Sequence, residues 1–214
     1  KETLFNPALT AVTPSYDGRR DEPLSLPAKV PVILMLGTEG IAVGMATSIL
    51  PHNFAEILQA QVRYLKGEAY RALRPDFATG GIMDASEYHD GRGKVKVRAK
   101  LEADGEKRVV ITEVPWTTTT ESLMASIEAA VGKGKVKIGN ITDKTGEEIR
   151  IELDLPRGVT TDEVIPQLYA FTDCEVEVNS NIVVIRERKP AELGVREILE
   201  ACTDGLKDII KLEL

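Results

Sequence analysis

The spacing of apolar residues predicts one well-defined helix early in the chain. Between residues 53 and 66, apolar side chains recur at intervals of three and four positions, which is typical of an amphipathic helix. Asn53 and Glu56 have the spacing of a capping box at its start, and Gly67 follows its end. We therefore expect a helix over residues 53–66.

Alternation with a period of two predicts a basic β-hairpin further along. Apolar and positively charged residues alternate over residues 94–102, which places four cations on one face of a strand. These cations are Lys94, Lys96, Arg98 and Lys100. A turn at residues 103–106 is expected to return the chain into a second strand at residues 108–114.

The rest of the chain alternates between strand and helix patterns. Thr118 with Glu121, and Thr160 with Glu163, are expected to cap two further helices. More strands are expected at residues 149–155, 175–178 and 182–186, with a last helix from about residue 195. This order predicts an α+β fold, with a mainly antiparallel sheet and helices packed on one face.

The first fifty residues contain many turn formers. Five prolines and the Asp17-Gly18 pair predict extended, loop-rich structure. A glycine-rich run at residues 37–47 has neither the spacing of a dinucleotide-binding fingerprint nor the Lys-Ser or Lys-Thr of a phosphate-binding loop. Its glycines permit a tight loop from which Ile41 projects, and a core position for Ile41 stays open as the alternative.

Composition and charge limit the functional classes. A chain of 214 residues with 43% hydrophobic residues can bury a core, and its net charge of −7 argues against a surface that binds polyanions throughout. Residues 91–112 nevertheless carry seven cations against three anions, whereas residues 146–186 carry three against nine. The basic segment is either a local nucleic-acid patch or a solvated face.

No catalytic centre or metal site emerges from the residue pattern. The two histidines, His52 and His89, have no neighbouring ligand cluster, and the isolated Cys174 and Cys202 fit a reducing cytoplasm. No apolar run is long enough to span a membrane. His52 precedes the helix cap, so it either shapes the entry to the helix or contacts a phosphate.

Several segments together resemble the A subunit of bacterial type IIA topoisomerases, the family of DNA gyrase and topoisomerase IV. The resemblance runs through nearly the whole chain in the family's order. It rests on Pro-Ser-Tyr-Asp-Gly at 14–18, Leu-Pro-Ala-Lys-Val-Pro at 26–31, Gly-Ile-Ala-Val-Gly-Met-Ala-Thr at 40–47, Pro-His-Asn at 51–53, Arg-Pro-Asp-Phe-Ala-Thr-Gly-Gly at 74–81, Gly-Arg-Gly-Lys at 91–94 and Ile-Thr-Glu-Val-Pro at 111–115.

The resemblance implies the tower domain of the breakage-reunion core. Residues 1–52 would form a loop-rich segment that faces DNA, residues 53–190 the α+β tower, and residues 191–214 a helix that leads towards a coiled coil. In the family the catalytic tyrosine lies upstream of the segment matched by 14–18, so Tyr16 is not its equivalent and this piece is not expected to cleave DNA by itself. The resemblance does not separate supercoiling from decatenating enzymes.

The resemblance also assigns residues and partners. Ile41 corresponds to an isoleucine that wedges between base pairs of the gate duplex and kinks it. Lys29, Arg19 and Arg20 would contact phosphates, and Arg92, Lys94, Lys96 and Arg98 would hold the outer arm of the bent DNA. This piece would bind no cofactor itself, because Mg²⁺ and ATP would belong to the partner B subunit of a cytoplasmic, nucleoid-associated A2B2 heterotetramer.

Two alternatives of other classes stay open. One is a non-catalytic nucleic-acid-binding α+β module that shares only the fold. The other is a structural domain whose basic hairpin docks an acidic protein.

Overall fold

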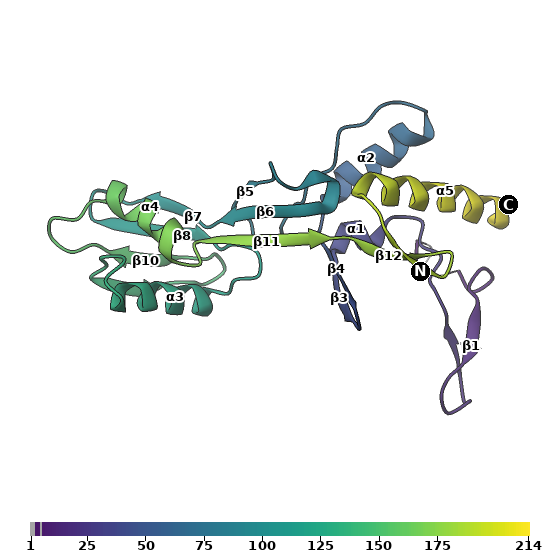
Figure 1. Cartoon of the computed structure of the whole chain (residues 1–214), viewed down its shortest axis with the longest axis horizontal. Coiled ribbons are helices and arrows are strands. Elements are labelled where there is room, and N and C mark those ends of the chain that lie inside the picture. Colours follow the sequence, from purple (N-terminus) through teal and green to yellow (C-terminus); the bar gives the residue numbers. More distant parts are fainter. Residues whose placement is uncertain (1–2, 5) are drawn as a thin grey trace. The chain divides into compact units, whose positions relative to one another are not determined.

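The computed structural model describes residues 3–4 and 6–214, which divide into two compact units (Figure 1). The first unit contains the described residues up to Pro75, together with Asp90–Arg92 and Ser180–Leu214. The second contains Asp76–His89 and Gly93–Asn179. These boundaries differ from the three segments expected from the sequence, whose functional division stays a prediction.

The first unit combines three β-hairpin elements with helices. Its elements are β1 (Val12–Pro14), β2 (Asp21–Pro23), α1 (Val32–Leu36), β3 (Thr38–Ala42), β4 (Met45–Ile49), α2 (Phe54–Leu65), β12 (Val183–Arg186), β13 (Lys189–Glu192) and α5 (Val195–Glu213). The expectation of loop-rich structure before residue 50 is therefore only partly right. Short strands pair there as β1–β2 and β3–β4, and the predicted turn at Asp17-Gly18 closes the first hairpin.

Helix α2 confirms the helix expected at residues 53–66. The Asn53 side chain accepts hydrogen bonds from the backbone N–H groups of Ala55 and Glu56, so it caps the helix as its position predicted. The buried face of α2 packs against α5, where the Gln61 amide donates to the Thr203 hydroxyl at 3.3 Å. This packing fixes the helix that follows the β3–β4 hairpin.

The second unit is built on antiparallel strands. Its elements are β5 (Ile82–Asp84), the 3₁₀ turn η1 (His89–Gly91), β6 (Arg92–Arg98), β7 (Lys100–Ala103), β8 (Arg108–Glu113), α3 (Thr120–Gly132), β9 (Asn140–Asp143), β10 (Ile151–Asp154), α4 (Thr161–Phe171) and β11 (Glu175–Asn181). Three of these elements are shared, because residues 90–92 of η1 and β6 and residues 180–181 of β11 are assigned to the first unit. Strands β7, β8, β10 and β9 form a four-stranded sheet in that order. Strand β6 lies between β11 and β5.

Both helices of the second unit cover the same face of the four-stranded sheet. Ile151 pairs with Ile111 and Leu153 with Val109, so these side chains share one face. All four belong to a buried cluster that includes Leu123 and Ile127 of α3 and Val164 and Leu168 of α4. The expected α+β class, with helices on one face of a mainly antiparallel sheet, is confirmed.

The expected basic hairpin is wrong in one respect. The chain does not run as one strand from 94 to 102, because it leaves one sheet and enters another at Ala99. Strand β6 pairs with β5, and only β7 pairs with β8 as the expected hairpin. Ala99 is fully buried, its N–H donates to the Cys174 carbonyl at 2.8 Å, and the β7 register shifts beside it. Alternation continues through this break, so the sequence pattern does not reveal it.

Two helix caps also differ from expectation. Helix α3 is capped by Thr119 with Ser122 in a reciprocal capping box, one residue beyond the expected Thr118 and Glu121. Helix α4 does begin after Thr160, but the Thr160 side chain makes no capping hydrogen bond. Several candidate hydroxyls stand side by side at residues 117–120, so spacing alone selects the wrong one.

Candidate nucleic-acid interface

The β3–β4 hairpin presents exposed apolar side chains at its end. Ile41 is 95% exposed and Val43 is fully exposed, although both are residues that proteins usually bury. Ile41 pairs with Ala46 across the hairpin, one residue pair from the Val43-Gly44 turn. The core position that stayed open for Ile41 is therefore wrong. Sequence reasoning missed Val43, which follows Ile41 by two residues in the same run.

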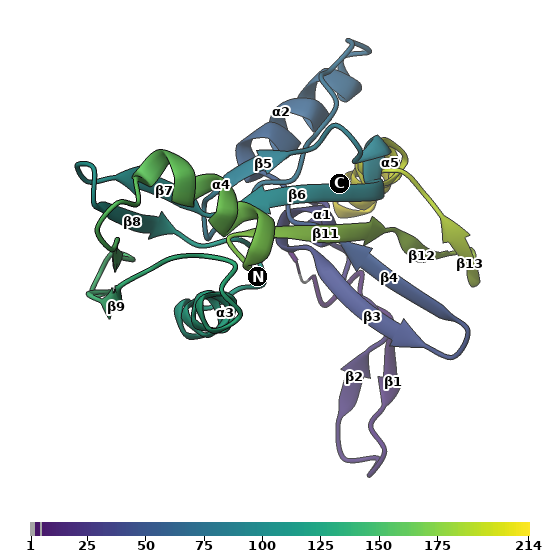
Figure 2. The ribbon, with the colours of Figure 1, turned by 60° about the vertical axis from the view of Figure 1, so that its left-hand side comes forward.

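The hairpin is held rigidly at both ends. Gly37 enters β3 with a φ of 69°, and a Cβ atom there would lie 2.6 Å from the Ile49 carbonyl oxygen, so the position requires glycine. Gly44 closes the turn with a φ of 80°. Along β4, the Asn181 amide donates to the Ala46 carbonyl at 3.1 Å. A braced strand pair thus carries Ile41 away from the unit's core, as Figure 2 shows for β3 and β4.

The predicted phosphate contacts before the hairpin lie in two different places. Arg19 and Arg20 stand in the exposed turn of the β1–β2 hairpin, where Arg19 is 3.7 Å from Asp17. The Ser15 hydroxyl and the Arg19 backbone N–H lower the pKa of Asp17. Lys29 is half-buried, and its ammonium lies 2.7 Å from the Glu213 carboxylate near the end of α5.

His52 is buried, and its surroundings favour the interpretation that it shapes the helix entry. Its backbone N–H donates to the Leu34 carbonyl at 2.8 Å, and its Nδ1 lies 3.2 Å from the same oxygen. It also forms an isolated bridge with Pro75. With 3% of its surface exposed, His52 ties α1 to the start of α2.

The structure brings the cations of β6 together with glutamates of β11. Lys94 lies 3.0 Å from Glu177 and 3.5 Å from Glu87, and Lys96 lies 3.9 Å from the same Glu177. Glu177 raises the pKa of Lys94, chiefly through their hydrogen bond. Arg98 binds Glu175, and Arg92, which belongs to the first unit, lies 3.2 Å from Glu197. This face is neither bare nor merely solvated, because each cation already has an acidic partner.

The acidic segment at residues 146–186 contains one buried carboxylate. The Glu152 side chain on β10 is only 5% exposed. Lys144, Arg150 and Arg108 surround it at 2.9, 2.9 and 3.6 Å. The hydrogen bond from Lys144 is the main cause that lowers the pKa of Glu152. Glu152 therefore stabilises the outer face of the second unit rather than facing solvent.

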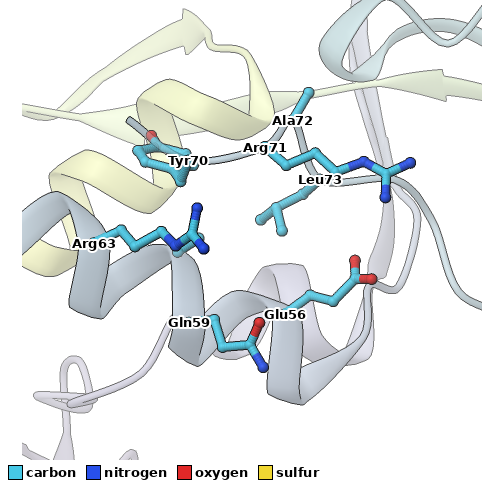
Figure 3. A pocket seen from close by; sticks show the side chains of 8 residues that line it. Glu56, Gln59, Arg63, Tyr70, Arg71, Ala72 and Leu73 are labelled. Atoms are coloured by element: carbon cyan, nitrogen blue, oxygen red, sulfur yellow. The ribbon is translucent and has the colours of Figure 1, made fainter. Parts of the chain in front are cut away.

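A polar hollow of about 300 Å³ lies beside α2 in the first unit (Figure 3). Arg63 points into it from α2, while the charged ends of Arg71 and Glu56 lie at its opposite side. The Tyr70 hydroxyl donates to Glu200 at 2.9 Å, and burial is the main cause that raises the pKa of Tyr70. The hollow is therefore lined by side chains of both charges.

Other chemistry has little support in the part of the chain that the structure describes. No group of three or more His, Cys, Asp or Glu residues there could hold a metal ion. Burial raises the pKa of the Cys174 thiol to about 11, which disfavours the reactive thiolate. No helix over residues 3–4 and 6–214 is long and apolar enough to cross a membrane.

Comparison with known proteins gives a consistent family. The profile of the DNA gyrase/topoisomerase IV A-subunit family matches residues 3–214. The A subunit of DNA topoisomerase 4 from Borreliella burgdorferi is 49% identical over 213 residues, which cover 100% of this chain and 34% of the relative. The chain thus spans about a third of the length of this curated relative.

More distant relatives agree. The A subunit of DNA topoisomerase 4 from Staphylococcus epidermidis is 33% identical over 92% of this chain and 27% of its own length. The A subunit of DNA gyrase from Chlamydia pneumoniae is 32% identical over 94% of this chain and 26% of its own length. Both enzyme types are similar to the chain, so the match does not distinguish between them.

Proposed function

The chain belongs to the DNA gyrase/topoisomerase IV A-subunit family, and we propose that it binds and bends the duplex through which the parent enzyme passes a second duplex. In this proposal, the β3–β4 hairpin enters the DNA, and cations of both units hold the displaced arms. The second unit is the tower that flanks the bent duplex.

The exposed Ile41 is the observation that carries the proposal. Its side chain is 95% exposed on a braced hairpin, and full burial of an isoleucine side chain is favourable by about 1.5–3 kcal/mol. Unstacking one base step costs a few kcal/mol, so an inserted Ile41 offsets most of that cost. Phosphate contacts that become possible only on bent DNA supply the remainder.

The cations fall into two groups in this proposal. Arg19 and Arg20 stand in an exposed turn, where phosphates can approach directly: the Arg19 side chain is 84% exposed although it lies 3.7 Å from Asp17. Lys29, Arg92, Lys94, Lys96 and Arg98 already have carboxylate partners, so a phosphate must displace or share those partners. We therefore expect the second group to contribute less affinity for each contact than its charge suggests.

The remaining steps of the reaction are proposed to lie elsewhere in the parent enzyme. A tyrosine outside the segments matched here would attack the DNA phosphate, and the B subunit would handle ATP and Mg²⁺ in an A2B2 assembly on the nucleoid DNA. The described residues offer no cluster that fits a metal ion, so no step is assigned to a metal held by this chain. Its own residues bind, position and bend DNA.

Substitution of Ile41 tests the proposal. The parent enzyme, with Ile41→Ala in its full-length A chain and its B partner present, is mixed with a short duplex labelled at both ends for energy transfer. We expect the bent fraction to fall by about tenfold or more, because the wedge loses most of the roughly 1.5–3 kcal/mol gained on burial. Thermal stability should stay unchanged, since Ile41 has no core contacts to lose.

Ile210→Ala is the matched control. Ile210 on α5 is 45% exposed, so the substitution removes the same atoms from another surface of the protein. It should leave DNA bending intact. An Ile41→Ala enzyme that bends DNA as the wild type does would refute the wedge.

A further inference from the structure

The tip of the β12–β13 hairpin carries three exposed cations that no sequence motif singled out. Arg186, Arg188 and Lys189 form, together with Glu187, what we call the cationic tip. None of the three forms an ion pair with a described residue, in contrast to the cations of β6. The tip therefore presents an excess of positive charge that is not neutralised locally.

The backbone of the cationic tip adopts a conformation that its residues disfavour. Arg186 pairs with Lys189, so Glu187 and Arg188 form a two-residue loop with φ angles of 51° and 64°. Two consecutive left-handed residues are typical of a type I′ turn, where asparagine and glycine are strongly preferred. Both residues are exposed, so burial does not account for their presence. Strain of this kind is commonly kept where side chains have a function.

Hydrogen bonds connect the base of this hairpin to the strand pair that carries Ile41. The Thr47 hydroxyl on β4 accepts from the Val183 N–H at 3.1 Å and lies 3.3 Å from the Asn181 carbonyl, to which it donates. The Asn181 amide donates to the Ala46 carbonyl, and Ala46 is the cross-strand partner of Ile41. All these residues belong to the first unit. The two hairpins are therefore joined through β4.

We propose that Arg186, Arg188 and Lys189 bind phosphates of the DNA arm next to the kink made by Ile41. This inference rests on the proposed function and adds a contact to it. A phosphate backbone is a regular array of anions, and three unpaired cations within four residues suit it without any need for an apolar pocket. Because the base of this hairpin is hydrogen-bonded to β4, the cationic tip would fix the position of the arm relative to the wedge.

The test replaces all three cations by glutamine in the full-length A chain of the parent enzyme, with its B partner present. Each phosphate contact contributes about 0.9 to the slope of log affinity against log salt concentration, so the slope should fall by about 2.7. A variant with Lys133→Gln, Lys137→Gln and Arg157→Gln changes the net charge equally. Those residues are exposed, lie in the second unit and form no ion pair with a described residue. Its slope should not change.

Arg188→Gly provides a second, independent readout. Glycine suits the left-handed position, so the melting temperature should rise while the salt slope falls by about 0.9. A purely structural role would change stability without changing the slope. If the salt slope of Arg188→Gly falls while Ile41→Ala bends DNA as the wild type does, the phosphate contact of the cationic tip stands and the proposed bending by Ile41 is refuted.

Three results would overturn the inference. The slope of the triple cationic-tip variant stays at the wild-type value, or it falls by the same amount as that of the charge-matched variant. In the third, DNA binding is unchanged and assembly with the B partner weakens, which would assign the tip to an acidic protein surface.

Discussion

The β3–β4 hairpin and strand β6 differ in the chemical character of the surface that each would present to DNA. The hairpin ends in apolar side chains that have nothing to pack against, whereas β6 carries cations that glutamates of β11 and of the preceding loop already neutralise. By charge alone β6 is the more obvious DNA-binding element. In the proposed function the hairpin is nevertheless the principal DNA-binding element, because exposed apolar side chains gain more from contact with a ligand than cations that already have carboxylate partners.

The difference arises from long-range contacts. The partners of Lys94 and Arg98 are Glu177 and Glu175, which lie 83 and 77 positions further along the chain. A strand face that looks basic in the sequence therefore becomes a mixed-charge face when the chain folds. Among the described residues, no such partner lies at the end of the hairpin, and Ile41 stays exposed.

The largest effect is expected from Gly37→Ala, which breaks the hairpin at its base. A left-handed backbone costs a residue with a side chain about 1–3 kcal/mol, and the new Cβ atom would also clash with the Ile49 carbonyl. Chemical denaturation should register that loss of stability, and DNA bending should fall with it. The salt dependence contributed by β6 should persist.

Gly44→Ala is the control within the same hairpin. Gly44 has a φ of 80°, but a Cβ atom there meets nothing within 4 Å. The cost should therefore be limited to about 1–2 kcal/mol from the backbone. Equal losses for Gly37→Ala and Gly44→Ala would contradict the close contact at Gly37.

A smaller effect is expected from Glu177→Gln, which removes a carboxylate partner from two cations of β6. Removal of the carboxylate frees Lys96 and leaves Lys94 paired with Glu87 alone. An exposed ion pair is typically worth about 0.2–1 kcal/mol, so DNA affinity should rise by up to about fivefold. Titrations at several salt concentrations would measure this, with Glu148→Gln as a charge-matched variant at an exposed position. Unchanged affinity would mean that β6 does not reach DNA.

The regular elements of the fold were largely predictable from local patterns. The helix after Asn53, the strand at β10 and the final helix all follow from apolar periodicity and capping residues. The break at Ala99 was not predictable, because the chain changes sheets there without any change in its alternation. The choice of Thr119 over Thr118 as the cap was not predictable either, because each has a possible capping partner three residues later and spacing does not separate them.

The candidate site was predictable only in part. Family motifs pointed to Ile41, whereas its residue type alone suggested the core. The local sequence does not predict the glutamate partners of β6 or the position of β12 beside β4, since both depend on contacts between residues far apart in the chain. One sequence feature indicated the cationic tip, namely three cations within Arg186–Lys189. The acidic composition of the preceding segment made this small cluster easy to overlook.

The most direct test of the wedge places the fluorescent base 2-aminopurine in a duplex at the expected kink. Unstacking of this base raises its fluorescence, so the parent enzyme, with its A and B chains both present, should increase the signal at one base step and not at neighbouring steps. Ile41→Ala should abolish the increase while DNA remains bound. An equal increase with alanine at position 41 would contradict the central claim that this side chain opens the base stack.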